Sequence, residues 1–220
     1  MSRGLFITFE GSEGCGKSTQ VQRLAARLER TGAKFLLTRE PGGTFIGEKI
    51  RELLQFTPEA RGMEAETELL LFEASRAQLV REVIAPALAR GVLVLSDRFY
   101  DSTTVYQGVA RRLEAKVVTQ MNDFAVGACR PDATFILDVD LETARQRMLR
   151  RVRPVCAPDR MEQEPMEFYE RVCVAYRELA KLQTERMHLI DGAGAPDEIE
   201  SKIWEALTRK FPASFASAPP

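Results

Sequence analysis

The sequence predicts an α/β protein in which a parallel sheet of about five strands is flanked by helices. Short β-prone runs alternate along the chain with longer helical patterns. The two central runs, 92–95 and 135–137, are continuously apolar, as strands buried on both faces are. The composition agrees with a folded protein, since 45% of the 220 residues are hydrophobic and 29% are charged. Such alternation is typical of a parallel sheet covered by helices on both sides.

Five runs are expected to form the strands and three to form the longest helices. The predicted strands are Leu5–Glu10, Lys34–Thr38, Val92–Ser96, Thr134–Asp138 and His188–Asp191. The predicted helices are Ser18–Arg30, Thr67–Arg90 and Pro165–Arg186. Residues 1–210 are predicted to form one domain, and residues 211–220, rich in Pro, Ala and Ser, a disordered tail. Because ligands of such sheets bind where strands end, the residues after each strand are the candidates for chemistry.

Charge and cysteine content limit the classes of function. The 31 Lys and Arg against 32 Asp and Glu give a net charge of −1, so no overall positive field attracts nucleic acid or anionic lipid. The four cysteines include no CxxC pair and are too few for a disulfide scaffold. No apolar run approaches the ~18 residues that a membrane span needs. We therefore expect a cytoplasmic protein that binds small molecules and neither nucleic acid nor a membrane.

The first predicted strand leads directly into a complete GxxxxGK[ST] motif, which opens a helix in the manner of a P-loop NTPase. Glycines let backbone N–H groups turn inward around an anion, and the helix N-terminus adds its positive dipole end. We expect Lys17 to reach the β- and γ-phosphates of ATP and Ser18 to ligate Mg²⁺. The residues expected to bind the nucleotide are Gly11, Ser12, Glu13, Gly14, Cys15, Gly16, Lys17, Ser18 and Thr19.

The sequence argues against a GTPase switch. The NKxD string that reads guanine is absent. The only DxxG string, at 191–194, follows the last predicted strand and comes too late to serve as a switch. A P-loop enzyme is therefore the favoured class.

Charged side chains also follow the second and third predicted strands. A Pro-Gly-Gly turn at 41–43 leaves Arg39 and Glu40 at a strand's carboxyl end, where they suit an anionic ligand or, alternatively, a solvated ion pair. Asp97 is placed to bind Mg²⁺ or to accept a proton, and Arg98 to neutralise an attacking phosphate. The alternative for Asp97 is a helix-capping role.

Two further strings carry side chains suited to a nucleobase. Phe72 and Arg76 are four residues apart on one predicted helix face, so that a base stacked on the ring lies within reach of the guanidinium. Burial in the core is the alternative for Phe72. Thr103, Tyr106 and Gln107 share a predicted helical face and offer hydroxyl and amide groups to a base edge.

Six arginines lie between residues 145 and 160, against the single acid Asp159. The predicted helix 141–151 runs into a stretch with two prolines, which is typical of a mobile cover. We therefore predict an arginine-rich lid at about 147–163 that neutralises a transferring phosphoryl group on closure. Arg153 is the first candidate for the catalytic lid arginine, followed by Arg147 and Arg160; a solvated basic surface is the alternative.

The chain resembles the thymidylate kinases from about Gly4 to Trp204. The resemblance is carried, in order, by the P-loop and by the strings Thr-Arg-Glu-Pro-Gly-Gly-Thr44, Leu-Phe-Glu-Ala-Ser-Arg76, Asp-Arg-Phe-Tyr100, Ser-Thr-Thr104, Tyr-Gln-Gly108 and Asp-Arg-Met-Glu-Gln-Glu164. It implies ATP- and Mg²⁺-dependent phosphorylation of dTMP to dTDP in a homodimer. The pair Glu13-Gly14 and the basic lid are similar to the bacterial type that relies on lid arginines.

The resemblance also implies a role for each matching residue. Phe72 would stack on thymine, Arg76 and Thr103 would contact the base edge, Tyr106 would crowd the 2′ position, and Arg39 and Arg98 would hold the dTMP phosphate with Glu40 and Gln107 nearby.

Two departures from the family pattern stand out. Ser75 occupies a position where many members have an acid, and Arg-Pro-Val-Cys-Ala-Pro replaces a glycine-containing stretch of the lid. The competing hypotheses are a deoxynucleoside kinase, another nucleoside monophosphate kinase, and an ATP-gated binding protein. Arg39, Arg98 and the lid arginines speak against a nucleoside acceptor, because an uncharged acceptor needs fewer cations.

Overall fold

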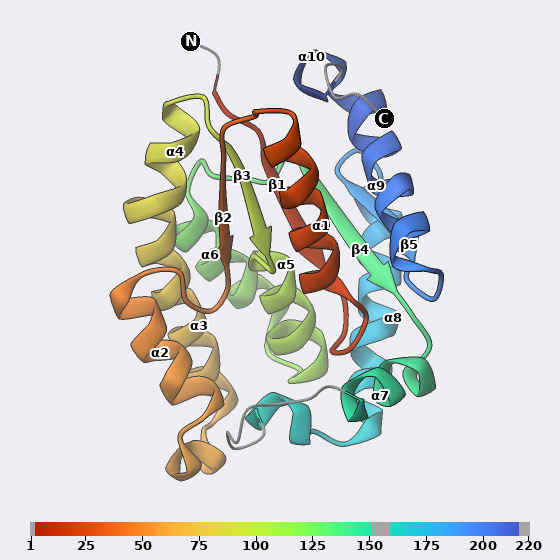
Figure 1. The fold of residues 1–220 in the computed structure, drawn as a ribbon. Helices are drawn as coiled ribbons and strands as arrows, with labels where there is room; N and C mark the ends of the chain where they lie inside the picture. The colour runs from red at the N-terminus through yellow and green to blue at the C-terminus, as the bar shows by residue number, and fades with distance from the viewer. Residues whose placement is uncertain (1–2, 151–158, 216–220) are drawn as a thin grey trace.

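The computed structural model describes residues 3–150 and 159–215, in which a five-stranded sheet lies between two layers of helices (Figure 1). The strands are β1 (Phe6–Glu10), β2 (Phe35–Arg39), β3 (Leu93–Asp97), β4 (Ala133–Asp138) and β5 (Met187–Asp191). All neighbours pair in parallel, in the order β2-β3-β1-β4-β5. Every predicted strand is confirmed to within one residue at each end, and β1 lies at the centre of the sheet.

Helices cover both faces of the sheet, and α10 lies at the end opposite the arrowheads of the strands (Figure 1). The elements after β1 and β2 are α1 (Lys17–Arg30), α2 (Phe45–Gln55), η1 (Pro58–Gly62), α3 (Ala65–Leu79), η2 (Val80–Ile84) and α4 (Ala85–Ala89). Those after β3 are α5 (Tyr100–Thr103), η3 (Thr104–Ala110) and α6 (Ala115–Val126). Those after β4 and β5 are α7 (Leu141–Leu149), η4 (Arg160–Gln163), α8 (Met166–Leu182), α9 (Pro196–Lys210) and α10 (Pro212–Phe215).

The side chains of β1 show why the strand is apolar throughout. Phe9 packs on one face of the sheet in a cluster with Leu24 of α1 and Ile203 of α9. Phe6 points to the other face and packs with Ile84 near the start of α4. Because successive side chains of a strand point to opposite faces, covering both faces requires an unbroken apolar run. This buried centre fixes the end of β1, from which the P-loop leaves the sheet.

Two predicted helical segments have π-type turns. The helix predicted at 67–90 is interrupted at Val80–Ile84, directly before Pro86, whose missing N–H prevents a regular i→i−4 bond. The segment Thr104–Ala110 is also π-type, so Thr103, Tyr106 and Gln107 do not follow the predicted α-helical spacing. All three side chains are nevertheless buried, and Tyr106 packs with Phe168 and Tyr176 of α8.

Part of the predicted disordered tail is ordered. Pro212–Phe215 forms a helical turn, and Phe215 is only 2% exposed, with its ring centroid 5.5 Å from that of Trp204 on α9. The aromatic side chain finds apolar surface on α9, which orders this part of the tail. Residues 216–220 lie outside the described residues. Among the helices of the described segments, none is both long enough and apolar enough to cross a membrane.

Candidate active site

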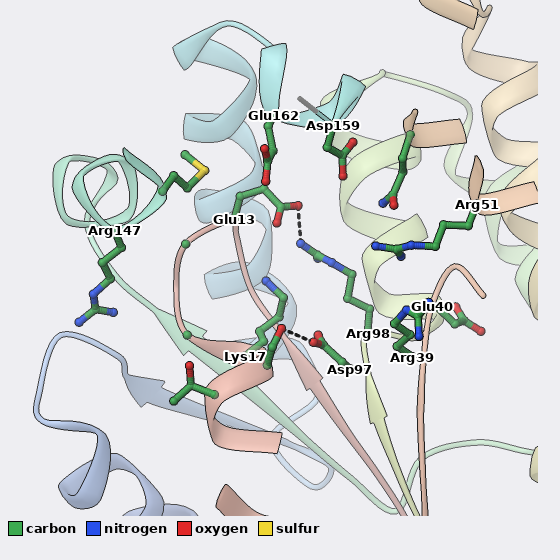
Figure 2. Close-up of a pocket in the computed structure, with 16 residues that line it drawn as sticks. Glu13, Lys17, Arg39, Glu40, Arg51, Asp97, Arg98, Arg147, Asp159 and Glu162 are labelled. Atoms are coloured by element: carbon green, nitrogen blue, oxygen red, sulfur yellow. Dashed lines mark hydrogen bonds and ion pairs between the residues drawn. The ribbon is translucent and has the colours of Figure 1, made fainter. Parts of the chain in front are cut away.

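A cavity of about 430 Å³, the main cavity, opens at the carboxyl ends of β1, β2 and β3 (Figure 2). Five cations and five acids line it, so its charge is high and balanced. The lining residues are Glu13, Gly14, Gly16, Lys17, Ser18, Thr19, Arg39, Glu40, Arg51, Gln55, Asp97, Arg98, Arg147, Met148, Asp159 and Glu162. The predicted P-loop and the charged residues after β2 and β3 therefore meet at one site.

The P-loop is shaped by glycines with left-handed backbone angles. Gly14 has φ 73° and Gly16 has φ 101°, values that side chains disfavour. At Gly14 a Cβ atom would also lie 2.3 Å from the carbonyl oxygen of Ala144 on α7. The ammonium of Lys17 lies inside the loop, where it donates to the carbonyl oxygens of Gly11 (3.1 Å) and Ser12 (2.7 Å). The loop thus has the backbone form of a phosphate cradle, with its cation at the centre.

The two predicted metal ligands lie side by side. The hydroxyl of Ser18 donates to Oδ2 of Asp97 at 2.5 Å (Figure 2). Both side chains present oxygen, which Mg²⁺ prefers, and one or two such ligands suffice where phosphates and water complete the shell. No group of three or more His, Cys, Asp and Glu side chains arranged for a metal exists within residues 3–150 and 159–215. The donor set present fits a phosphate-bound Mg²⁺.

Arg98 adopts a conformation that is uncommon outside glycine. Its φ is 72°, and strained angles of this kind persist where the surrounding structure enforces them, often at functional sites. Its guanidinium pairs with Glu13 of the P-loop at 2.5 Å and donates to Ser102 at 3.1 Å (Figure 2). Burial by itself would lower the pKa of Arg98, but Glu13 raises it well above its usual value. Arg98 therefore remains a fixed cation between the P-loop and the segment after β3.

Glu10, at the end of β1, binds the segment that follows β3. It is buried at the end of β1 and accepts hydrogen bonds from the backbone N–H of Phe99 (2.8 Å), from Ser102 (2.6 Å) and from Tyr176 (2.8 Å). Burial and the nearby Asp101 raise the pKa of Glu10. These bonds fix the turn in which Arg98 leaves β3.

Arg39 and Glu40 leave the end of β2 in different directions. Arg39 is half exposed at the rim of the main cavity and pairs with Glu48 of α2 at 2.8 Å. Glu40 is buried and accepts two bonds from Arg76, at 2.9 and 2.6 Å, through Oε2. Its Oε1 has no hydrogen-bond partner among the described residues. Burial raises the pKa of Glu40 to about 7, although Arg76 opposes the shift.

Arg76 is held inside the protein rather than beside Phe72. It is 1% exposed, pairs with Glu73 at 2.5 Å as well as with Glu40, and donates to Asn122 at 3.2 Å. Neighbouring Ser75 accepts a bond from the backbone N–H of Gly42 at 3.2 Å. The serine that departs from the family pattern therefore ties α3 to the Pro-Gly-Gly turn. A contact between Arg76 and a base stays a prediction.

A small pocket of about 40 Å³, the side pocket, adjoins the main cavity. Its lining residues are Glu13, Pro41, Gln55, Phe72, Arg98, Ser102, Thr103, Tyr106, Gln107 and Met161. Phe72 is partly exposed there, which agrees with a stacking surface more than with a core role. The hydroxyl of Thr103 is buried without a partner among the described residues. An aromatic face next to an unsatisfied polar atom suits a flat polar ring.

The three candidate lid arginines have different surroundings. Arg147 donates to the carbonyl oxygens of Gly192 (2.8 Å) and Ala193 (3.3 Å), and Figure 2 shows it on the far side of the P-loop from Arg98. Arg160 is bound to the carbonyl oxygen of Leu54 and to a buried glutamate of α3. Arg153 lies outside the described residues. The choice among the three stays a prediction.

Sequence reasoning missed four polar residues that line the main cavity, and Met148 as well. Arg51 and Gln55 are one helical turn apart on α2, and their i, i+4 spacing after the Pro-Gly-Gly turn is a signal that could have found them. Burial and nearby Arg39 lower the pKa of Arg51. Asp159 and Glu162 belong to the string Asp-Arg-Met-Glu-Gln-Glu164, whose resemblance to the family implied no site role for either residue. Burial, with Glu13 and Glu162 close by, raises the pKa of Asp159 to about 6.

Comparison with known proteins gives one family. The protein-family model described as "Thymidylate kinase" matches residues 9–203 of this chain. A thymidylate kinase of Deinococcus radiodurans is 43% identical over 210 residues, which cover 96% of this chain and 99% of that protein. One of Pseudomonas putida is 47% identical over 200 residues, 91% of this chain and 93% of that protein. The crystal structure of thymidylate kinase from Ehrlichia chaffeensis superimposes with a TM-score of 0.75 at 33% identity, covering 94% of this chain and 99% of that one.

Proposed function

Because the chain belongs to the thymidylate kinase family, we propose that it transfers the γ-phosphoryl group of ATP to the phosphate of dTMP and so forms dTDP. The observation that carries this proposal is that the main cavity and the side pocket adjoin each other. Arg98, Glu13 and Gln55 line both the main cavity and the side pocket, so that a nucleoside in the side pocket would direct its phosphate toward the P-loop.

The cations of the main cavity supply what two neighbouring phosphate chains require. The P-loop backbone and Lys17 bind the phosphates of ATP. Arg39 and Arg98 approach from the other end and hold the acceptor phosphate, and Arg51 stands beside them. Fixing both anions and neutralising their repulsion is the main catalytic task in phosphoryl transfer, because the protein has little covalent chemistry to perform. No residue of this set needs to form a bond to phosphorus.

Ser18 and Asp97 are the residues that we propose hold Mg²⁺. Bound there, the ion would neutralise charge on the ATP phosphates. The chain's own contribution is to keep the two oxygens adjacent, which their mutual hydrogen bond at 2.5 Å supports. Asp97 also stands next to Arg98 in the sequence, so the same turn presents one acid to the metal and one cation to the acceptor phosphate.

The side pocket is the proposed site of thymine. Phe72 offers its ring for stacking, and Thr103 and Gln107 offer polar atoms to the base edge. Tyr106 is buried against Phe168, with ring centroids 5.9 Å apart, so it forms a rigid wall near the sugar. Arg76 would contribute to base binding by its bond to Glu40, which fixes the position of α3 and of Phe72 on it.

Arg153 remains our first choice for the lid arginine that reaches the transferring phosphoryl group. Arg160 would first have to give up its bonds to Leu54 and α3, and Arg147 its bonds to the loop after β5. An Arg153→Ala variant should lower kcat about 10³-fold or more, while Arg160→Ala and Arg147→Ala should have smaller effects on kcat. A larger loss of kcat in either of the latter variants would reassign the catalytic arginine.

We also propose a homodimer in the cytoplasm. Helices α3 and α6 pack on each other and carry exposed apolar side chains, including Leu70, Val117 and Phe124, the last 79% exposed. A partner copy would cover them. The molar mass from light scattering should correspond to two chains, and it should fall toward one chain in Phe124→Glu.

A turnover screen tests the proposed reaction. Purified protein with MgATP is offered dTMP, dUMP, dCMP, AMP and thymidine, and the nucleotide products are separated and quantified. The expected result is conversion of dTMP to dTDP far faster than any other acceptor. Thymidine turnover above that of dTMP would favour the deoxynucleoside kinase, and ATP binding without transfer to any acceptor would favour a binding protein.

A further inference from the structure

Glu68 of α3 joins Gln107 of the side pocket to Arg160 of η4. Its side chain is fully buried. Oε1 accepts a hydrogen bond from Nε2 of Gln107 at 2.6 Å and a longer one from Nε of Arg111 at 3.2 Å. Oε2 accepts from Arg160 at 2.6 Å and from Arg111 at 3.1 Å. Gln107 therefore bonds to one oxygen of the carboxylate, Arg160 to the other, and Arg111 to both.

These partners keep Glu68 ionised. Burial by itself would raise its pKa, but the hydrogen bonds and charges of Arg111, Gln107 and Arg160 hold the pKa below the usual value. An ionised carboxylate accepts hydrogen bonds and donates none. Gln107 must therefore turn its NH₂ group toward Glu68.

The orientation of this amide decides what the side pocket presents. With Nε2 committed to Glu68, the carbonyl oxygen Oε1 of Gln107 is the amide atom left for the pocket that the residue lines. It accepts no hydrogen bond from any described residue. The pocket thus offers a hydrogen-bond acceptor, which suits a bound ring that carries a donor at this point.

We propose that Glu68 is a positioning residue that selects the base by fixing the orientation of the Gln107 amide. Thymine and uracil carry an N–H at ring position 3, which can donate to Oε1, whereas cytosine has a lone pair there that Oε1 repels. A site built to pair one polar group discriminates strongly against an analogue that leaves it unpaired. This inference rests on the proposed function and adds a determinant that does not itself touch the substrate.

The variant Glu68→Gln should reverse the amide of Gln107. Oε2 accepts the short bond from Arg160 and one from Arg111, so the new amide keeps its oxygen there and places its NH₂ against Gln107. This arrangement gives up only the longer bond from Nε of Arg111 to Oε1, at 3.2 Å. Gln107 then has to accept with Oε1 and turn its own NH₂ into the pocket. A donor now meets the N–H of thymine, while the lone pair of cytosine gains a partner.

The experiment measures kcat/KM for dTMP, dUMP and dCMP. Glu68→Gln should lower the dTMP:dCMP ratio about 10-fold or more, chiefly through a higher KM for dTMP. The dTMP:dUMP ratio should stay unchanged, because both bases present the same edge at position 3. Ratios between substrates do not depend on the fraction of folded enzyme, so partial unfolding of the variant does not obscure the result.

Two further variants separate positioning from a general structural effect. In a Gln107→Ala background, Glu68→Gln should leave the dTMP:dCMP ratio unchanged. Glu164→Gln removes the charge of the other acidic partner of Arg111, at 2.5 Å, without touching Gln107, and should preserve the ratio of the unmodified protein. An unchanged ratio in Glu68→Gln, or an equal change with Gln107 absent, overturns the proposal. Absence of dTMP turnover in the unmodified protein would instead refute the proposed function.

Discussion

The backbone of the P-loop is shaped by bonds between nearby residues, whereas the side pocket and its surroundings depend on side chains far apart in the sequence. Side chains from the end of β3 add long-range bonds to Glu13 and Ser18. Lys17 bonds to carbonyl oxygens five and six residues away. Arg76 instead bonds to Glu40, 36 residues away, and Arg160 to Glu68, 92 residues away. The phosphate end of the site is thus a local backbone structure, and the base end depends on buried charge pairs between separate helices. Substitutions in the two regions should consequently fail in different ways.

The largest effect on stability is expected from Arg76→Met. Without the guanidinium, Glu40 and Glu73 remain buried with their main cation removed, and breaking such a pair costs about 3–5 kcal/mol. Urea unfolding gives the change in the free energy of unfolding. The matched control is Glu48→Gln, which breaks the exposed Arg39 pair and should cost no more than about 1 kcal/mol. Similar losses in both variants would remove the contrast between the buried and exposed pairs.

The opposite behaviour is expected of Lys17→Ala. Activity with dTMP should fall about 10²–10³-fold or more, because the variant loses the cation that meets the phosphates of ATP. The circular dichroism spectrum should change little, since left-handed glycines shape the loop. The urea midpoint should fall only slightly, through loss of the two bonds from the ammonium to Gly11 and Ser12. Lys34→Ala, at an exposed position before β2, serves as the control with normal activity. Full activity in folded Lys17→Ala would show that the loop is not the phosphate site.

A pH dependence of stability is expected from Glu40. Its folded pKa is about 7 against an ordinary value of 4.5, so between these pH values the folded state binds more protons than the unfolded chain. The contribution of Glu40 to the free energy of unfolding is therefore greatest below about pH 4.5 and falls as the pH rises to about 7, by roughly 1–3 kcal/mol. Glu40→Gln lacks this change. The difference between the two unfolding free energies, measured across this range, should follow that trend; a constant difference contradicts it.

The smallest effect is expected from Ser75→Ala. The variant leaves the buried N–H of Gly42 without its acceptor, at a cost of about 1 kcal/mol. The loss should appear in the urea midpoint and in a higher KM for dTMP, because the turn carries Arg39 and Glu40. Ser75→Thr, which keeps the hydroxyl, tests whether the hydrogen bond or the space matters. An unchanged midpoint in Ser75→Ala would show that the link between α3 and the turn is dispensable.

The sequence predicted the sheet and the P-loop well because both have local causes. The apolar runs at 92–95 and 135–137 had to be strands covered on both faces, and they became the inner part of β3 and β4. The glycines of the motif had to adopt left-handed angles, and Gly14 and Gly16 do. The pattern could not reveal the π-type turns, because they depend on which backbone bonds survive near Pro86 and within 104–110.

Pairings across long distances were beyond sequence reasoning. Phe72 and Arg76 are one helical turn apart, which predicted that both side chains would face the same ligand. That shared ligand stays a prediction. The spacing did not indicate that Arg76 also pairs with Glu40 and Glu73, which an interior guanidinium needs because an unpaired one would be very costly. Similarly, no spacing in the chain indicates that Glu68 bonds to both Gln107 and Arg160.

By itself, the sequence determined the parallel sheet, the phosphate loop and the family, because hydrophobic periodicity and a contiguous glycine-rich motif act over a few residues. Only the tertiary structure decided which carboxylate meets which arginine, where the side pocket joins the main cavity, and which amide atom of Gln107 faces it. These choices follow from burial, which forces each polar group to find a partner wherever the fold brings one within reach.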